Sequence, residues 1–188
     1  RAQLDNMTDV VKVFGAKGVP GIGLPGPRIE GPVETMGFKA FNLARMAAIG
    51  LPVPQAFVLG TPFCQTFGDD PAAFRPALRK LLESQIERLE AACGLEFGSG
   101  RKPLLVSVRS GAPVSMPGMM DTLLDVGLTD ATLRGLLRLT GNPRLVWDSY
   151  RRLIQQYAEV VHHTPPAPFR EALALAMAET GARHPQEL

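Results

Sequence analysis

One polar segment of the sequence, from Ser107 to Thr122, carries residue types that suit a phosphate-bearing ligand. Its glycines, prolines and serines favour a loop whose backbone N–H groups can point at an anion. Arg109 lies near its start, and a guanidinium can bind phosphate through two parallel hydrogen bonds. The segment therefore suits a polyphosphate, and a structural loop with Arg109 in an internal ion pair explains the same residues equally well.

A second cation, Lys39, follows Gly37 and Phe38 at the expected start of a helix. The N–H groups of a helix N-terminus and a lysine ammonium can together bind a phosphate. A single lysine at such a position is more often solvated, so the local sequence alone favours solvation.

Methionines and an aspartate in the polar loop each allow two interpretations. Met116, Met119 and Met120 either pack beneath a neighbouring subdomain or form a soft surface for an adenine ring, and packing is favoured. Asp121 is either a metal ligand or a turn residue that bonds its own backbone, and the turn is favoured. Local sequence thus establishes neither a base pocket nor a metal site.

The elements that position these residues are predicted from apolar spacing and turn residues. Hydrophobic residues recur at helical spacing after Gly37, and Gly50 is suited to end that helix. Residues 55–59 predict one strand, and Leu104–Val108 predict a buried strand before the polar loop. An apolar stripe predicts a long amphipathic helix between these strands. The stripe comprises Phe74, Leu78, Leu81, Leu82, Ile86, Leu89 and Cys93.

The N-terminal region is expected to contribute little regular structure. Val10–Phe14 allows a short strand. From Gly15 to Gly31, repeated glycines and prolines argue against a helix or a central strand, so an extended lead-in is expected.

The C-terminal half predicts mainly helices. Thr129 is expected to cap one helix, and Asn142 with Pro143 to start a longer one through Val161. The buried stripe of the longer helix is predicted to comprise Val146, Tyr150, Leu153, Ile154, Tyr157 and Val161. A last, alanine-rich helix is expected over 169–180.

Composition excludes several functional classes. The chain has 188 residues, 45% hydrophobic and 20% charged, which is typical of a soluble globular protein. Its net charge of +2, with interleaved acids and bases, argues against nucleic-acid or membrane binding. Cys64 and Cys93 form no disulfide or zinc pattern and are expected to be buried apolar side chains. Without a membrane span or signal peptide, a cytoplasmic location is expected.

Three blocks of the sequence resemble the nucleotide-binding domain of the pyruvate, phosphate dikinase family. They are Lys39–Met46 with Gly50–Gln55, Pro103–Ala112 continuing through Ser115–Thr122, and Gly141–Arg144 with Asp148–Arg152. The resemblance extends from about Val33 to His163. The middle block is the most specific, because related phosphoenolpyruvate synthases and water dikinases resemble its methionine-rich loop less closely.

This resemblance implies an α/β (α+β) fold, namely an incomplete ATP-grasp-like domain with a largely helical second subdomain. The implied organisation is a Gly/Pro-rich lead-in over 1–32, an α/β subdomain over 33–128 and a helical subdomain over 129–188. In that family, ATP is held between subdomains, and its phosphate passes to a histidine on a separate swivelling domain.

The same resemblance implies roles for individual residues. Lys39 and Arg109 are assigned to the ATP phosphates, and Arg109 also to catalysis, because a cation stabilises the transferring group. The loop around Gly118 and Met119 is assigned to ATP contacts through its backbone. ATP and Mg²⁺ are the implied cofactors.

Two departures from the family pattern limit these implications. Phe38 and Ala40 stand where the family usually has glycines, which puts close approach of the backbone to a phosphate in doubt. The sequence also ends at Leu188, before the acidic magnesium ligands, the phosphate-accepting histidine and the pyruvate-binding barrel of the family. The three histidines present match no such motif and are expected at the surface or at helix ends.

The implied full-length enzyme is a kinase-type phosphotransferase. It converts ATP, phosphate and pyruvate into AMP, pyrophosphate and phosphoenolpyruvate through a phosphohistidine. This portion is not expected to turn over alone, because the metal ligands and the acceptor lie outside it. Its expected partners are ATP, the other domains of the enzyme and, in a homo-oligomer, further copies. The alternative is a stand-alone ATP-binding or regulatory module that acts through protein contacts.

Overall fold

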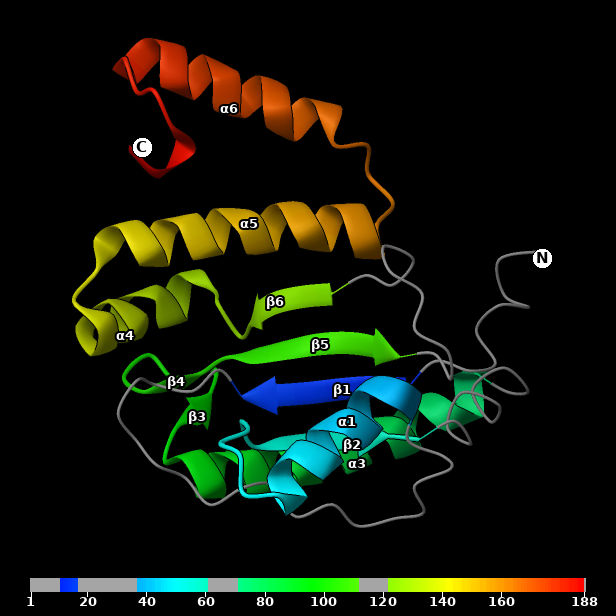
Figure 1. Cartoon of the computed structure of the whole chain (residues 1–188). Helices are drawn as coiled ribbons and strands as arrows, with labels where there is room; N and C mark the ends of the chain where they lie inside the picture. The colour runs from blue at the N-terminus through cyan, green and yellow to red at the C-terminus, as the bar shows by residue number, and fades with distance from the viewer. Residues whose placement is uncertain (1–10, 17–36, 61–70, 112–121, 188) are drawn as a thin grey trace.

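A four-stranded antiparallel sheet lies at the centre of the computed structural model (Figure 1). Its spatial order is β2-β1-β5-β6. The strands are β1 (Val11–Ala16), β2 (Ala56–Leu59), β5 (Val106–Gly111) and β6 (Thr122–Val126). The structure describes residues 11–16, 37–60, 71–111 and 122–187.

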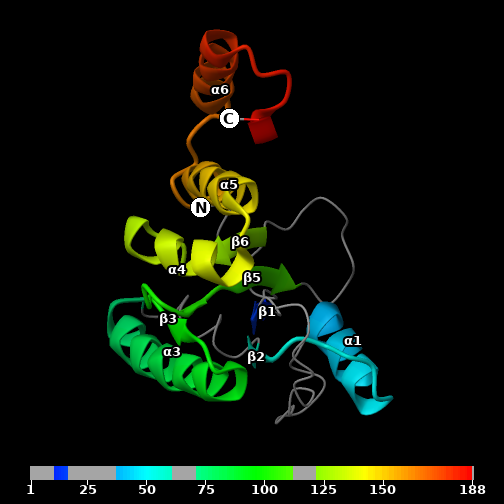
Figure 2. The same ribbon diagram turned by 90° about the vertical axis from the view of Figure 1, so that its left-hand side faces the viewer.

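Two helices lie on opposite sides of this sheet (Figure 2). They are α1 (Gly37–Ala48) and α3 (Pro71–Cys93), and both agree with the helices predicted from apolar spacing. The chain leaves α1 through Gly50, whose φ of 81° is a left-handed conformation that glycine adopts without strain. A short parallel pair, β3 (Glu96–Phe97) and β4 (Pro103–Leu104), then leads from α3 into β5.

All described secondary-structure elements after β6 are helices. The elements are α4 (Asp130–Thr140), α5 (Pro143–Val161), α6 (Ala167–Thr180) and the short 3-10 helix η2 (Pro185–Glu187). Both predicted helix starts are confirmed. Thr129 is the N-cap of α4, and Asn142 accepts a hydrogen bond of 3.1 Å from the N–H of Leu145 at the start of α5.

Two apolar clusters hold these layers together. One lies between the sheet and α3 and comprises the buried residues Leu89, Leu104 and Val106. The other joins the sheet to α4 and α5 and comprises Leu105, Leu128, Leu133, Val146 and Leu153. Because Leu104–Val106 contribute to both clusters, the chain that leads into β5 is fixed from two sides.

Three strand predictions need correction. Gly15 and Ala16, expected in the loop of the 1–32 lead-in, extend β1, a central strand. The strand predicted to end at Val108 continues through Arg109–Gly111 of the expected polar loop, as part of β5. The strand β6 has no counterpart among the predicted elements. In each case, pairing with a distant segment supplies backbone hydrogen bonds that local sequence does not reveal.

The predicted buried stripe of α5 is only partly right. Val146 and Leu153 are buried, and Tyr150 packs against them. Ile154, Tyr157 and Val161 are exposed, because α5 contacts the sheet along a narrower side than its apolar pattern suggests. None of the described helices is both long and apolar enough to cross a bilayer.

Candidate functional site

Arg109 lies near the C-terminal end of β5, between Val13 of β1 and Thr122 of β6. Val106 of the same strand packs towards α3 in the core. Because successive strand residues point to opposite faces, Arg109 points away from α3. Its side chain is exposed, and no carboxylate of the described residues lies within salt-bridge distance of it.

Lys39 lies in the first turn of α1, which lies on the side of the sheet opposite α3, the side towards which Arg109 points (Figure 2). This helix packs against β5 and β1. Its N-terminal end lies beside the arrowhead of β5 in both views (Figures 1 and 2). The structure therefore brings the turn that contains Lys39 to the strand end that contains Arg109, while the Lys39 side chain lies outside the described part.

The other predicted ATP contacts lie outside the described residues. They are Gly118 and Met119, and the same holds for Met116, Met120 and Asp121. All five belong to the connection between β5 and β6. Their roles stay predictions, although both ends of that connection are fixed by the pairing of Arg109 with Thr122.

The strand that follows this connection contains an irregularity next to the site. In β6, Asp125 is buried and has a φ of 58°, which is unusual for a residue other than glycine. The neighbouring N–H of Leu124 donates a hydrogen bond of 3.3 Å to Oε1 of Gln156 on α5. The sequence predicted neither the backbone conformation of Asp125 nor this hydrogen bond. Gln156 in particular is one of several polar residues on an amphipathic helix, so nothing local distinguishes it.

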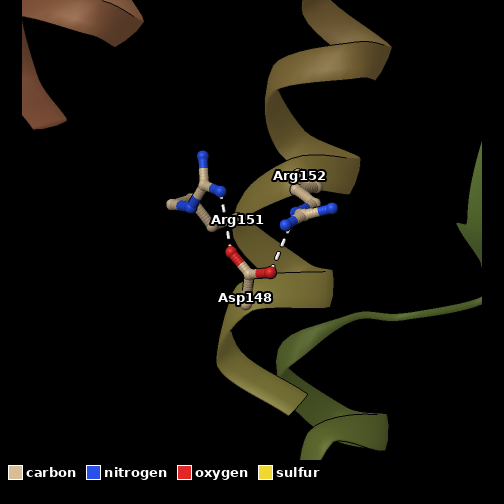
Figure 3. Close-up of polar contacts among 3 residues, drawn as sticks. All are labelled: Asp148, Arg151 and Arg152. Atoms are coloured by element: carbon tan, nitrogen blue, oxygen red, sulfur yellow. Dashed lines mark hydrogen bonds and ion pairs between the residues drawn. The ribbon is translucent and has the colours of Figure 1, made fainter. Parts of the chain in front are cut away.

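An ion-pair cluster on α5 lies within the third block of resemblance (Figure 3). Asp148 accepts from Nη2 of Arg151 at 2.7 Å and from Nε of Arg152 at 2.8 Å. Partial burial alone would raise the pKa of Asp148. The hydrogen bond from Arg151 and the charges of Arg152 and Arg151 outweigh it and hold the pKa below the ordinary aspartate value. The contacts are internal to α5, which indicates a structural role.

Comparison with known proteins decides the family. No protein-family model matches the chain. The pyruvate, phosphate dikinase of Clostridium symbiosum is 40% identical over 153 residues, which cover 81% of this chain and 18% of that protein. The pyruvate, phosphate dikinase of Rhizobium meliloti (strain 1021) and pyruvate, phosphate dikinase 2 of Zea mays are each 41% identical over 155 residues, or 82% of this chain and 17% of each relative. This chain belongs to the pyruvate, phosphate dikinase family.

The resemblance seen in the three sequence blocks is thereby confirmed. These pyruvate, phosphate dikinases are kinase-type enzymes by name, and the chain spans less than a fifth of the length of each. The described structure confirms a mixed α/β domain.

In the described part of this pyruvate, phosphate dikinase homologue, no group of three His, Cys, Asp or Glu side chains could hold a metal ion. His162, His163 and His184 are exposed, and His162 is the C-cap of α5, in agreement with the sequence prediction. Cys93 is half-buried against the α3 cluster, and burial raises the pKa of its thiol. Cys64 lies outside the described residues.

Replacement of Asp148 by asparagine is expected to lower stability in a pH-dependent way. The folded-state pKa of Asp148 is depressed, so its contribution is present above the unfolded-state pKa of about 3.9 and is lost as pH falls through the folded-state pKa. We expect Asp148→Asn to reduce the free energy of unfolding by about 1 kcal/mol at pH 7. The difference from wild type should shrink below about pH 4.

Urea denaturation of both proteins at a series of pH values measures this effect. Glu87→Gln, which alters an exposed carboxylate in α3, is the control and should match wild type throughout. A difference between Asp148→Asn and wild type that is constant with pH would contradict the ionic role of Asp148.

Proposed function

We propose that this chain forms part of the ATP site of a pyruvate, phosphate dikinase-like phosphotransferase. Its α/β portion would then belong to an ATP-grasp-like domain, with residues 129–188 as a helical subdomain. The proposal is carried by one observation: the first turn of α1 packs beside the end of β5 on one side of the sheet (Figure 2). Lys39 and Arg109 lie in these two segments, and we propose that both cations bind one polyphosphate.

The electrostatics of this arrangement suit phosphate. The N-terminal N–H groups of α1 carry partial positive charge, and the exposed guanidinium of Arg109 adds a full charge with two donors in parallel. In the proposed mechanism, Lys39 and Arg109 orient the phosphates, and Arg109 stabilises the charge that develops on the transferring group. The loop around Gly118 and Met119 contributes backbone N–H contacts.

Magnesium would supply further charge neutralisation at the phosphates. The exposed guanidinium of Arg109 at this strand end suits a phosphate. In keeping with the family resemblance, we propose that the magnesium ligands and the acceptor histidine come from other parts of the enzyme. On this proposal the chain alone binds ATP but does not complete the conversion of ATP, phosphate and pyruvate into AMP, pyrophosphate and phosphoenolpyruvate.

An ATP analogue with a lysine-reactive acyl phosphate tests the site directly. Such a probe acylates a lysine beside the bound phosphates, and mass spectrometry locates the modified residue. We expect Lys39 to be labelled and excess ATP to suppress this labelling. Lys80 and Lys102, both exposed, provide internal controls, because ATP should not protect them.

Arg109→Ala is expected to weaken ATP binding about tenfold or more, because a charge-assisted hydrogen bond contributes roughly 1.5–3 kcal/mol. Isothermal titration calorimetry with ATP and Mg²⁺ measures the affinity. If the affinity is too low for calorimetry, the protection of Lys39 by ATP from the acyl-phosphate probe measures it instead. Arg88→Ala removes an exposed arginine from α3 on the other side of the sheet and should leave binding unchanged. Equal effects of the two substitutions would contradict the assignment of Arg109.

The second candidate is an interaction module derived from the same domain. It is favoured by exposed apolar side chains on the helical part, since Trp147 is 58% and Leu175 is 65% exposed. The labelling experiment separates the two candidates. A folded chain in which ATP protects no lysine would favour the module.

A further inference from the structure

A hydrogen bond from an edge strand to a helix lies close to the proposed phosphate site. Strand β6 is at the edge of the sheet, and α5 packs along it (Figure 1). The N–H of Leu124 donates to Oε1 of Gln156 at 3.3 Å. An edge strand presents N–H groups without strand partners, and this bond supplies an acceptor for one of them.

Leu124 belongs to a bulge in β6. Val106 of β5 pairs with Val126, but Val108 pairs with Leu123. Two residues, Leu124 and Asp125, therefore lie opposite one residue of β5. A bulge disrupts the ladder and leaves its extra residue without a strand partner, so an acceptor outside the sheet favours this geometry.

The bulge decides which side chain lies beside Arg109. Beyond it, Thr122 pairs with Arg109, and directly opposed residues in an antiparallel pair point to the same face. Without the extra residue, the register would slip by one and Leu123 would oppose Arg109. The slip would place an apolar side chain beside the guanidinium and turn Thr122 towards the core.

We propose that Gln156 is a positioning residue for the phosphate site. Its amide oxygen holds the β6 bulge and thereby sets the register that places Thr122 beside Arg109. Gln156 acts through the backbone of Leu124 and touches no substrate. This inference rests on the proposed function, because it requires ATP to bind at Arg109.

The adjacent residue provides a matched control. Nε2 of Gln155 donates to Oε1 of Glu159 at 2.8 Å, so its bond stays within α5. Both glutamines are half-buried. Gln156→Met and Gln155→Met keep side-chain length and helix propensity while removing the amide, so they differ in which contact is lost. Gln156→Glu retains an oxygen acceptor and therefore tests whether an acceptor alone restores function. If Gln156→Met does not fold, Gln156→Asn, whose side chain is one methylene shorter, serves in its place.

Two measurements are made on each variant: hydrogen exchange at the Leu124 amide, and ATP-protected labelling of Lys39 by the acyl-phosphate probe. Gln156→Met is expected to speed exchange at Leu124 about tenfold, the effect of losing one hydrogen bond. It should also slow labelling of Lys39 about tenfold, because a slipped register weakens the contact of Arg109 with the phosphates by about the contribution of one hydrogen bond. Gln156→Glu should restore both, and Gln155→Met should change neither.

The outcomes separate the two proposals. If the wild-type chain shows no ATP-protected labelling, the proposed function fails and the role of Gln156 fails with it. If the wild-type chain is labelled and Gln156→Met is labelled at the same rate, the positioning role alone is overturned. Slow labelling in Gln156→Glu, despite restored protection of Leu124, would also overturn it, because the acceptor would then not be the property that matters.

Discussion

Leu104→Ala is expected to lower the free energy of unfolding by about 3 kcal/mol. Leu104 is fully buried and packs with Leu89 and Val106 between the sheet and α3. Truncation removes several buried methyl and methylene groups and leaves a cavity that the surrounding structure fills only partly. Since only Leu105 separates Leu104 from β5, the cavity would also loosen the strand that carries Arg109.

Urea denaturation followed by circular dichroism measures this loss. Leu139→Ala, in which a leucine of α4 that is 38% exposed is truncated, is the control and should cost less than about 1 kcal/mol. Similar losses at the two positions would mean that Leu104 does not lie in the main core.

Gly135→Ala is expected to destabilise the protein by about 2 kcal/mol, although alanine is ordinarily the better residue inside a helix by about 1 kcal/mol. Gly135 is buried in α4, and a Cβ there would lie 2.8 Å from the carbonyl oxygen of Gly100 and 2.8 Å from Cδ of Pro103. These are a backbone atom and a rigid ring, so neither can move aside cheaply. The steric cost should therefore exceed the gain in helix propensity.

Enlarging the side chain distinguishes this clash from simple backbone strain. Gly135→Leu should cost more than Gly135→Ala, because overpacking grows with volume. Gly141 has a φ of 62°, and a Cβ at this position would meet no atom within 4 Å. Alanine and leucine should therefore cost about the same there, near 1 kcal/mol each. Thermal unfolding of the four variants tests the pattern, and a cost at position 135 that is independent of size would contradict it.

The helix ends could be predicted from sequence because their determinants are local. Thr129 is followed by Thr132, whose hydroxyl oxygen accepts from the N–H of Thr129 at 2.8 Å. Asn142 and Pro143 similarly place a cap and a first-turn residue next to each other. In such cases a few adjacent residues satisfy the backbone groups that a helix end leaves free.

The strands could be predicted less well, because their partners are distant in the sequence. Gly15 has poor strand propensity, yet it pairs with Ala56 on one side and Ser107 on the other. In β6, the buried Asp125 interrupts the alternation that would have identified a strand. Pairing and burial of the sheet therefore override the local signals.

The candidate site likewise combines features that local sequence reveals with features that depend on tertiary packing. Arg109 and Lys39 could be selected from local chemistry, because cations next to glycine-rich turns and helix starts suit phosphate. Their placement on one side of the sheet depends on the alternation of β5 and on the packing of α1, which require the assembled sheet. Gln156 could not be selected, since its contact with Leu124 exists only once α5 lies along β6.

The central position of β1 affects how the chain can assemble during synthesis. Val11 pairs with Gly111, so a further 100 residues (111 − 11) must be translated after Val11 before this pair can form. Until then β1 can pair with β2 alone, and its other edge is open to chaperones or to other nascent chains. On the ribosome, the surface formed by α1 and β5 is consequently completed only after β5 has emerged.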